Sequence, residues 1–130
     1  MPESTRLEQI QSRLEQFRDE RDWRQFHTLK DLAAAIAIEA GELQEHFLWV
    51  PVEEEQRLLS ERREEIGAEL ADVLIQCLNF ASAAGIDLAA AVASKIESNE
   101  LKYPVHLARG TSAKYTELAG PQGRKAQDEQ

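Results

Sequence analysis

Hydrophobic residues recur every three or four positions over most of this chain, which is the period of an amphipathic helix. The clearest case is the segment from about residue 5 to residue 21, where Leu7, Ile10, Leu14 and Phe17 share one face and charged residues occupy the other. No strand-like alternation of hydrophobic and polar residues competes with this pattern. The chain is therefore predicted to be all-α.

Residues that begin or end helices delimit three further helical segments. Thr and Asp side chains cap helix N-termini, glycine closes C-termini, and proline interrupts the helical hydrogen bonds. On this basis the segments span about residues 29–48, 53–84 and 87–101. The sequence thus predicts an all-α fold with four helices. The start and stop signals are Thr28, Pro51, Gly85, Asp87 and Pro104.

The third of these segments is predicted to lie at the centre of the core. It is charged up to Glu65 and is then hydrophobic on nearly all sides between Asp72 and Leu78, which is typical of a helix with neighbours all round. Toward the C-terminus the periodicity fades, and glycine and proline appear. We therefore expect one domain over residues 1–118 and a disordered tail over residues 119–130.

Composition and charge are those of a soluble protein. Of the 130 residues, 42% are hydrophobic and 30% are charged, which suits a globular domain. The single cysteine, Cys77, cannot form an intrachain disulfide, and the sequence has neither a signal-peptide pattern nor an uninterrupted hydrophobic run of about 18 residues. We expect a cytoplasmic protein that does not bind membranes. The net charge of −9 also argues against nucleic acid as a partner, because phosphate backbones are bound by Lys and Arg.

Two pairs of acidic residues interrupt the hydrophobic pattern. Glu39 and Glu42 lie in the second predicted helix, and Glu69 and Asp72 lie in the third. A separation of three residues turns a helix by about 300°, so the two carboxylates of each pair project from nearly one face. Both pairs are in phase with neighbouring hydrophobic residues, which places them on the faces that point into the core.

Four carboxylates between two packed helices indicate a bound cation. Burying an unpaired carboxylate costs several kcal/mol unless a cation or a hydrogen-bond donor compensates it. Oxygen-only ligands favour Mg²⁺, with Mn²⁺ as the alternative. A ferritin-like di-iron site needs Glu-x-x-His on two helices, and no Glu in this chain has His three residues later. Zinc is also disfavoured, because the chain has only one Cys and three scattered His.

Aromatic and polar residues near the acidic pairs are candidates for ligand binding. Trp23 and Trp49 flank the second helix, where an indole either completes the core or stacks on a base. Lys95, Asn99 and Lys102 are spaced four and three residues apart, so they share one helix face. That face is either solvated or directed at phosphate oxygens.

Taken together, these residues resemble the MazG-like nucleotide pyrophosphohydrolases of the all-α NTP pyrophosphatase superfamily, and within it the dCTP pyrophosphatase branch. The family pattern of E-x-x-E, a spacer and E-x-x-D is matched by Glu39, Glu42, Glu69 and Asp72. The likeness extends over about residues 5–118. The local matches are Arg21-Asp22-Trp23, Phe26-His27, the segment from Glu39 to Trp49, Ser94-Lys95, Asn99, and the segments Tyr103–Arg109 and Lys114–Leu118.

The resemblance implies a four-helix MazG-like bundle that forms a homo-oligomer, a tetramer in preference to a dimer, with sites that borrow residues from adjacent subunits. It also implies Mg²⁺-dependent hydrolysis of a (deoxy)nucleoside triphosphate, dCTP or a related dNTP, between the α- and β-phosphates, giving the monophosphate and pyrophosphate. The four carboxylates would serve as metal ligands and as catalytic residues. The implied substrate-binding residues are Trp23, His27, Trp49, Gln76, Lys95, Asn99, Lys102, Tyr103, Arg109, Lys114 and Tyr115.

Two positions depart from the branch, and two other functions stay open. Gln76 stands where the branch often has an aromatic residue, and Leu14 stands where a polar pocket residue is expected. Both differences leave the preference for cytosine open. A non-catalytic helical interaction module with a structural cation site would also account for the acidic pairs. A pyrophosphohydrolase that acts on another nucleotide would share the same metal chemistry.

Overall fold

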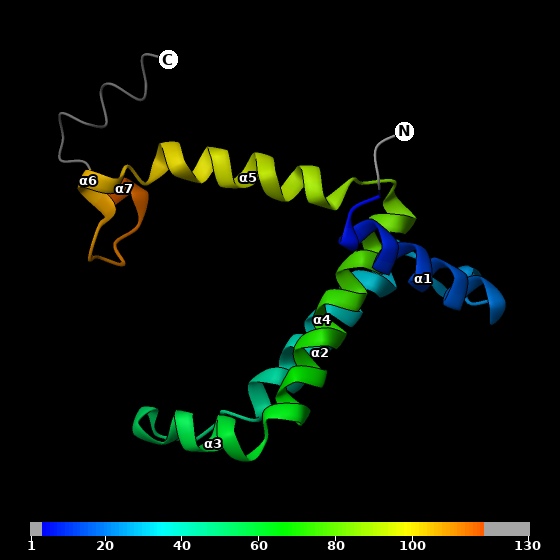
Figure 1. Cartoon of the computed structure of the whole chain (residues 1–130), viewed down its shortest axis with the longest axis horizontal. Helices are drawn as coiled ribbons and strands as arrows, with labels where there is room; N and C mark the ends of the chain where they lie inside the picture. Colours follow the sequence, from blue (N-terminus) through cyan, green and yellow to red (C-terminus); the bar gives the residue numbers. More distant parts are fainter. Residues whose placement is uncertain (1–3, 119–130) are drawn as a thin grey trace. The chain divides into compact units, whose positions relative to one another are not determined.

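The computed structural model describes residues 4–118, and every regular element in this range is a helix. The predicted all-α fold is therefore confirmed. The chain divides into two compact units, Met1–Leu88 and Ala89–Gln130, which are described one at a time below (Figure 1). The predicted disordered tail, residues 119–130, lies outside the described residues, and the single domain over residues 1–118 stays a prediction.

Threonine caps begin the first two helices of the first unit. At the start of α1 (Arg6–Glu20), the Thr5 hydroxyl accepts a hydrogen bond from the backbone N–H of Glu8 at 3.2 Å, and the Thr5 N–H donates to the Glu8 carboxylate at 2.6 Å. This capping box pairs N–H groups that a helix N-terminus leaves without partners. The Thr28 hydroxyl caps α2 (Leu29–Glu45) in a similar way, as predicted.

Helices α2 and α4 (Arg63–Ala84) pack side by side along most of their length and run in opposite directions (Figure 1). Gly85 ends α4 with a φ of 67°, a left-handed conformation that glycine adopts without steric cost. This pairing brings the acidic pair of α4 against α2. The buried hydrophobic residues of the core are Leu32, Ile66, Leu78 and Ala81.

The third predicted helix is interrupted, so the prediction of one helix over residues 53–84 is wrong. A 3-10 turn, η2 (Val52–Glu54), leads into the short helix α3 (Glu55–Glu61), and α4 begins only after Arg62. The Arg62 backbone has φ −123° and ψ 26°, outside the helical region. Residues 60–65 are all polar, so this stretch has no hydrophobic side chain to hold a continuous helix against α2. The second helix also ends early, at Glu45.

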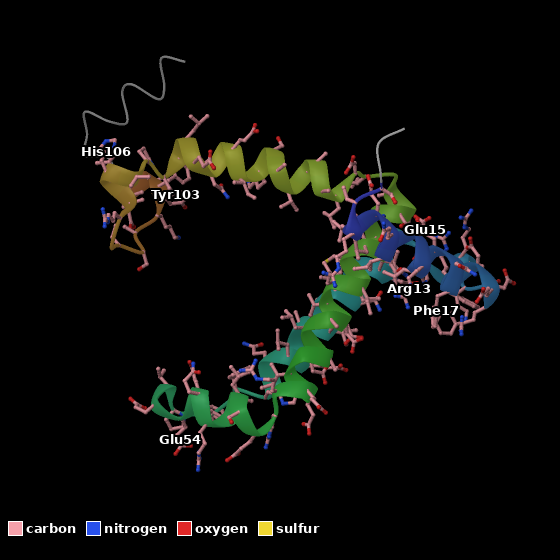
Figure 2. The ribbon with its side chains drawn as sticks, in the orientation of Figure 1. Arg13, Glu15, Phe17, Glu54, Tyr103 and His106 are labelled. Carbon is pink, nitrogen blue, oxygen red and sulfur yellow. The ribbon has the colours of Figure 1, made fainter. Side chains whose placement is uncertain are left out.

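Polar contacts join α1 to α4. The Gln11 amide donates a hydrogen bond to the Ser82 hydroxyl at 2.8 Å, and Ser82 donates to the Glu15 carboxylate at 2.9 Å (Glu15 is labelled in Figure 2). The Arg18 side chain is buried, and its Nε donates to the Asp19 carboxylate at 2.8 Å. The two contacts of Ser82 hold α1 against the C-terminal half of α4, whereas the Arg18–Asp19 pair lies within α1.

Large hydrophobic side chains stay exposed on the paired helices. They include Ile38 on α2 and Leu70 and Leu74 on α4. By length and composition alone α4 could cross a membrane. Core helices of helical bundles share that composition. In addition, α4 carries Glu69 and Asp72 near its middle, where burial in a bilayer would be energetically costly. Exposed hydrophobic patches mark surfaces that bind another surface.

The second unit, from Ala89 onward, contains all of α5 (Leu88–Lys102) except its first residue, together with α6 (Val105–Ala108) and α7 (Tyr115–Leu118). The sequence predicted α5, but not the two short helices that follow it. The Tyr103 and Tyr115 rings meet edge to face with centroids 6.2 Å apart, and the Lys102 ammonium lies 5.1 Å from the Tyr115 ring centroid (Tyr103 is labelled in Figure 2). This aromatic contact ties α7 to the end of α5.

Candidate active site

Carboxylates from the two paired helices meet in the first unit, as the sequence predicts. Oxygen atoms of Glu39 on α2 and of Glu69 and Asp72 on α4 all lie within 4.8 Å of one another. Glu42, one helical turn after Glu39, is close enough to interact electrostatically with Glu39 and Glu69. The two acidic pairs therefore form one group, which we call the acidic quartet: Glu39, Glu42, Glu69 and Asp72.

Two oxygens of the quartet are buried and have no hydrogen-bond partner among residues 4–118. These atoms are Oε2 of Glu39 and Oε2 of Glu69. The pKa of Glu39 is raised, first because burial penalises its charged form, and then because of the hydrogen bond and charge of Glu42 and the charges of Asp72 and Glu69. The pKa of Glu69 is raised by burial and by its carboxylate neighbours, with an opposing contribution from His46. A protein without a compensating cation thus carries an electrostatic penalty here.

The quartet has the chemistry of a hard divalent-cation site. It offers oxygen ligands alone, and two of its buried oxygens have no donor in the described part of the chain. Carboxylates in this arrangement suit Mg²⁺ or Mn²⁺. A divalent cation would satisfy both orphaned oxygens and remove the mutual repulsion. The residues present therefore fit the cation that the sequence predicts.

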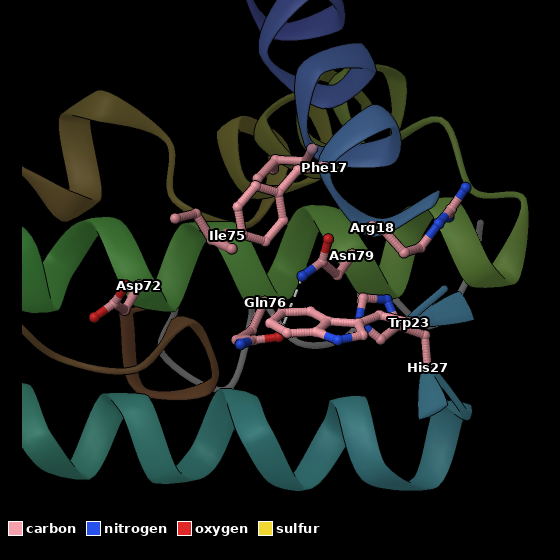
Figure 3. A pocket seen from close by; sticks show the side chains of 9 residues that line it. Phe17, Arg18, Trp23, His27, Asp72, Ile75, Gln76 and Asn79 are labelled. Carbon is pink, nitrogen blue, oxygen red and sulfur yellow. Dashed lines mark hydrogen bonds between the residues drawn. The ribbon is translucent and has the colours of Figure 1, made fainter. Parts of the chain in front are cut away.

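A cavity of about 310 Å³ opens beside the quartet, within the size range of small-molecule sites. Asp72 belongs to both the quartet and the wall of this cavity. Figure 3 shows side chains from α1, from the α1–α2 connection and from α4 converging on it. We call it the aromatic cavity. Its lining residues are Leu14, Phe17, Arg18, Trp23, His27, Asp72, Ile75, Gln76 and Asn79.

One wall of the aromatic cavity is made of rings. The Trp23 indole meets the Phe17 ring edge to face with centroids 5.6 Å apart, and Trp23 keeps 45% of its surface exposed. Behind Phe17, the Arg21 guanidinium lies 3.6 Å from the ring centroid. Packing thus fixes the orientation of the indole while leaving part of it available to a ligand.

The rest of the lining includes polar side chains. The Asn79 amide donates a hydrogen bond to the Gln76 carbonyl oxygen at 3.4 Å (dashed line in Figure 3). The pKa of His27 is lowered, first by burial and then by the charge of Arg18, so its imidazole is neutral at neutral pH and offers one donor and one acceptor. The aromatic cavity therefore combines a stacking surface with amide and imidazole groups that can read the edge of a base.

A second cavity, of about 480 Å³, lies on the other side of the quartet. Glu42 and Glu69 belong to its wall, together with Glu45, His46 and Arg62. The His46 Nε2 lies 3.8 Å from an oxygen of Glu69. We call this the polar cavity, because every lining residue is ionisable.

The structure brings together some of the predicted substrate-binding residues. Trp23, His27 and Gln76 line the aromatic cavity. Trp49 lines neither cavity, and it is 91% exposed with a φ of 65°. The other seven belong to the second unit, so their role in binding substrate stays a prediction: Lys95, Asn99, Lys102, Tyr103, Arg109, Lys114 and Tyr115.

Sequence reasoning missed several residues that line the two cavities. Asn79 lies three residues after Gln76 and seven after Asp72, so helical spacing from the acidic pair would have found it. Phe17 belongs to the hydrophobic face of α1, and helical spacing alone does not distinguish a cavity-lining residue from other residues on that face. His46 and Arg62 have no spacing signal, because they reach the polar cavity from a helix end and from a helix break.

The fold and site define a helical protein in which paired carboxylates on two antiparallel helices can hold a divalent cation beside a ligand cavity. The chain belongs to the MazG-like family, whose model matches residues 34–118. This match includes the whole acidic quartet and ends at the last described residue. The resemblance found in the sequence is thereby confirmed.

Curated relatives and a solved structure are similar to most of the chain. Proteins named dCTP pyrophosphatase 1 from Homo sapiens and Rattus norvegicus are each 42% identical over 130 residues, covering 98% of this chain and 75% of theirs. The one from Bos taurus is 40% identical over 125 residues, covering 95% of this chain and 73% of its own. A crystal structure of a pyrophosphatase from Archaeoglobus fulgidus superposes with a TM-score of 0.75 at 41% identity, covering 80% of this chain and 97% of its own.

Proposed function

We propose that this protein hydrolyses a deoxynucleoside triphosphate, dCTP or a related dNTP, between the α- and β-phosphates. The products are the monophosphate and pyrophosphate. The observation that carries the proposal is the union of the acidic quartet with the aromatic cavity, which share Asp72. Relatives named dCTP pyrophosphatase 1 and a neighbour named a pyrophosphatase support the same reaction.

The reaction needs a site that neutralises phosphates and activates water. The quartet would hold Mg²⁺, with Mn²⁺ as the alternative, and a bound divalent cation supplies positive charge and makes water more acidic. One carboxylate of the quartet accepts a proton from the attacking water. The water oxygen bonds to the α-phosphorus while the bond from that phosphorus to the bridging oxygen breaks. The bridging oxygen leaves with its electron pair as part of pyrophosphate.

The aromatic cavity would bind the base. The exposed part of Trp23 provides a stacking surface. Gln76 and Asn79 each carry an amide donor and an amide acceptor, and cytosine presents an amino donor beside ring-nitrogen and carbonyl acceptors. His27 adds a neutral donor and acceptor. This set of groups supports dCTP as a substrate and orients its α-phosphate toward Asp72.

We propose that the protein works as a homo-oligomer, a tetramer in preference to a dimer, in the cytoplasm. The exposed hydrophobic residues of α2 and α4 support an interface between copies. Trp49 supports shared sites, because a tryptophan that is 91% exposed buries almost none of its surface within its own chain. Its predicted contact with a base would then be made in the site of a neighbouring copy.

The second unit would add groups for the phosphates. Lys95 and Asn99 are exposed on α5, one helical turn apart. Lys102 is oriented by its contact with the Tyr115 ring. Ammonium and amide groups in this order suit phosphate oxygens. Arg109 and Lys114 carry the same predicted role.

The test is a panel of the four dNTPs with Mg²⁺, with both products identified. The proposal predicts monophosphate and pyrophosphate in equal amounts and no release of single phosphate. A Glu69→Gln variant that keeps its helical circular dichroism is the matched control and should be inactive. A chain that binds no dNTP in calorimetry, and releases no pyrophosphate from any of the four, would instead be a non-catalytic interaction module.

A further inference from the structure

The polar cavity has no part in the function proposed so far, although Glu42 and Glu69 of the acidic quartet line it. We propose that this cavity binds the pyrophosphate leaving group and that Arg62 and His46 are its pyrophosphate-binding residues. The proposal rests on the proposed function, because it assigns a place to one product of that reaction.

The two cavities lie at opposite ends of the quartet along α4. Gln76 and Asn79 line the aromatic cavity toward the C-terminus of the helix, and Arg62 lines the polar cavity just before its N-terminus. Glu69 and Asp72 lie between them. At a rise of about 1.5 Å per residue, Arg62 is about 10 Å from Glu69 along the axis, and Gln76 is about 6 Å beyond Asp72.

Helix α2 repeats this order in the opposite direction. His27 lies just before the helix and lines the aromatic cavity, whereas His46 lies just after it and lines the polar cavity. Glu39 and Glu42 lie between them. Both helices thus define one line from the base-binding groups, through the carboxylates, to a histidine and an arginine. A nucleoside triphosphate has the same linear order of base, α-phosphate and terminal phosphates.

Arg62 is the arginine that lines the polar cavity. Its side chain is exposed, and it forms no ion pair with a carboxylate between residues 4 and 118. It lies at the break between α3 and α4, where it lines the cavity. A guanidinium can donate two parallel hydrogen bonds to phosphate oxygens. A structural arginine would be expected to pair with one of the three nearby glutamates.

His46 is held close to the acidic quartet. Its side chain is 14% exposed, and its Nε2 lies 3.8 Å from an oxygen of Glu69. A neutral imidazole still donates one hydrogen bond, so its contact with a phosphate oxygen does not require protonation. When the bond between the α-phosphorus and the bridging oxygen breaks, that oxygen carries new negative charge. Arg62 and His46 would donate hydrogen bonds to the pyrophosphate that holds it.

Pyrophosphate binding by the full-length protein tests the proposal. Calorimetry with Mg²⁺ present should give a dissociation constant for pyrophosphate that rises by about tenfold or more in Arg62→Ala, since a hydrogen bond to a charged group is lost. His46→Gln should weaken binding by a smaller factor. In both variants the affinity for dCMP should stay within about twofold of the wild type, because the monophosphate lies on the other side of the quartet.

Arg63→Ala is the matched control, because Arg63 has the same charge but does not line the polar cavity. Its affinity for pyrophosphate should equal that of the wild type. The proposal is overturned if Arg62→Ala and His46→Gln bind pyrophosphate as the wild type does, or if Arg63→Ala loses as much affinity as Arg62→Ala. Equal losses for pyrophosphate and dCMP would also overturn it. Failure of the proposed function is seen separately, as a wild-type protein that releases no pyrophosphate from any dNTP.

Discussion

Replacement of Trp23 by alanine tests whether the aromatic cavity binds the base. Trp23 is 45% exposed and packs by its edge against Phe17. Applied to a side-chain surface of about 250 Å², this fraction leaves about 110 Å² for a ligand to cover. At about 25 cal/mol per Å², full coverage would contribute about 2.8 kcal/mol. A base that covers one face of the ring would gain about half of this, or about 1.4 kcal/mol, which is a factor of about ten in binding.

The assay is steady-state hydrolysis of dCTP with Mg²⁺, followed by release of pyrophosphate. Trp23→Ala should raise KM by about tenfold, while kcat changes by less than about threefold, because the indole contacts the base and not the reacting phosphate. Trp23→Phe keeps a ring in the same place and should stay within about threefold of the wild-type KM.

Two results would refute this reasoning about Trp23. One is a folded Trp23→Ala protein with the wild-type KM, which would mean that the base binds elsewhere. The other is an equal rise in KM for Trp23→Phe and Trp23→Ala, which would assign the loss to packing against Phe17 and not to stacking. Circular dichroism of both variants controls for unfolding.

Three further predictions concern the acidic quartet and shared sites. Glu42→Gln and Asp72→Asn should each lower kcat by at least about 100-fold while the helical circular dichroism is unchanged. If a variant loses both its helical circular dichroism and its activity, the replaced carboxylate has a structural role. Because its folded-state pKa is raised, Glu39 destabilises the metal-free protein once pH rises above the ordinary carboxyl range, so Glu39→Gln should melt above the wild type at neutral pH. That difference should vanish on acidification below about pH 4.5, and it should shrink or reverse on adding Mg²⁺, which stabilises the protein that binds it; its persistence at low pH would contradict the electrostatic cause. If copies share sites, Trp49→Ala, with a raised KM, and inactive Glu69→Gln should form some sites with the wild-type KM after they are mixed and allowed to exchange subunits, whereas a mixture that keeps only the raised KM of Trp49→Ala would rule sharing out.

Local signals predicted most of the helices of the first unit. Thr28 caps α2 within its own first turn, and Gly85 ends α4 by its own backbone conformation, whereas the Thr5 capping box of α1 was seen only in the structure. Each of these signals acts within a few residues. The break at Arg62 was not predicted, because its neighbours are good helix formers. It depends on where α4 starts to pack against α2, which is a tertiary contact.

The site likewise has parts that local sequence patterns predict and parts that depend on tertiary contacts. The acidic quartet could be predicted because each pair shares a helix face with hydrophobic residues, and two such faces pack together. Trp23 and His27 were predicted from the family resemblance, and both line the aromatic cavity. The polar cavity could not be predicted, because Arg62 and His46 are sixteen positions apart and meet only through the antiparallel packing of α2 and α4.

Divalent-cation binding by the quartet is the claim on which the account depends most. Calorimetric titration of the full-length protein with Mn²⁺ measures it without any substrate. The account predicts saturable binding to the wild type, and its loss in a Glu39→Gln, Asp72→Asn double variant that keeps the helical circular dichroism. Wild-type binding that survives unchanged in the double variant, or a wild type that binds no Mn²⁺, would contradict it.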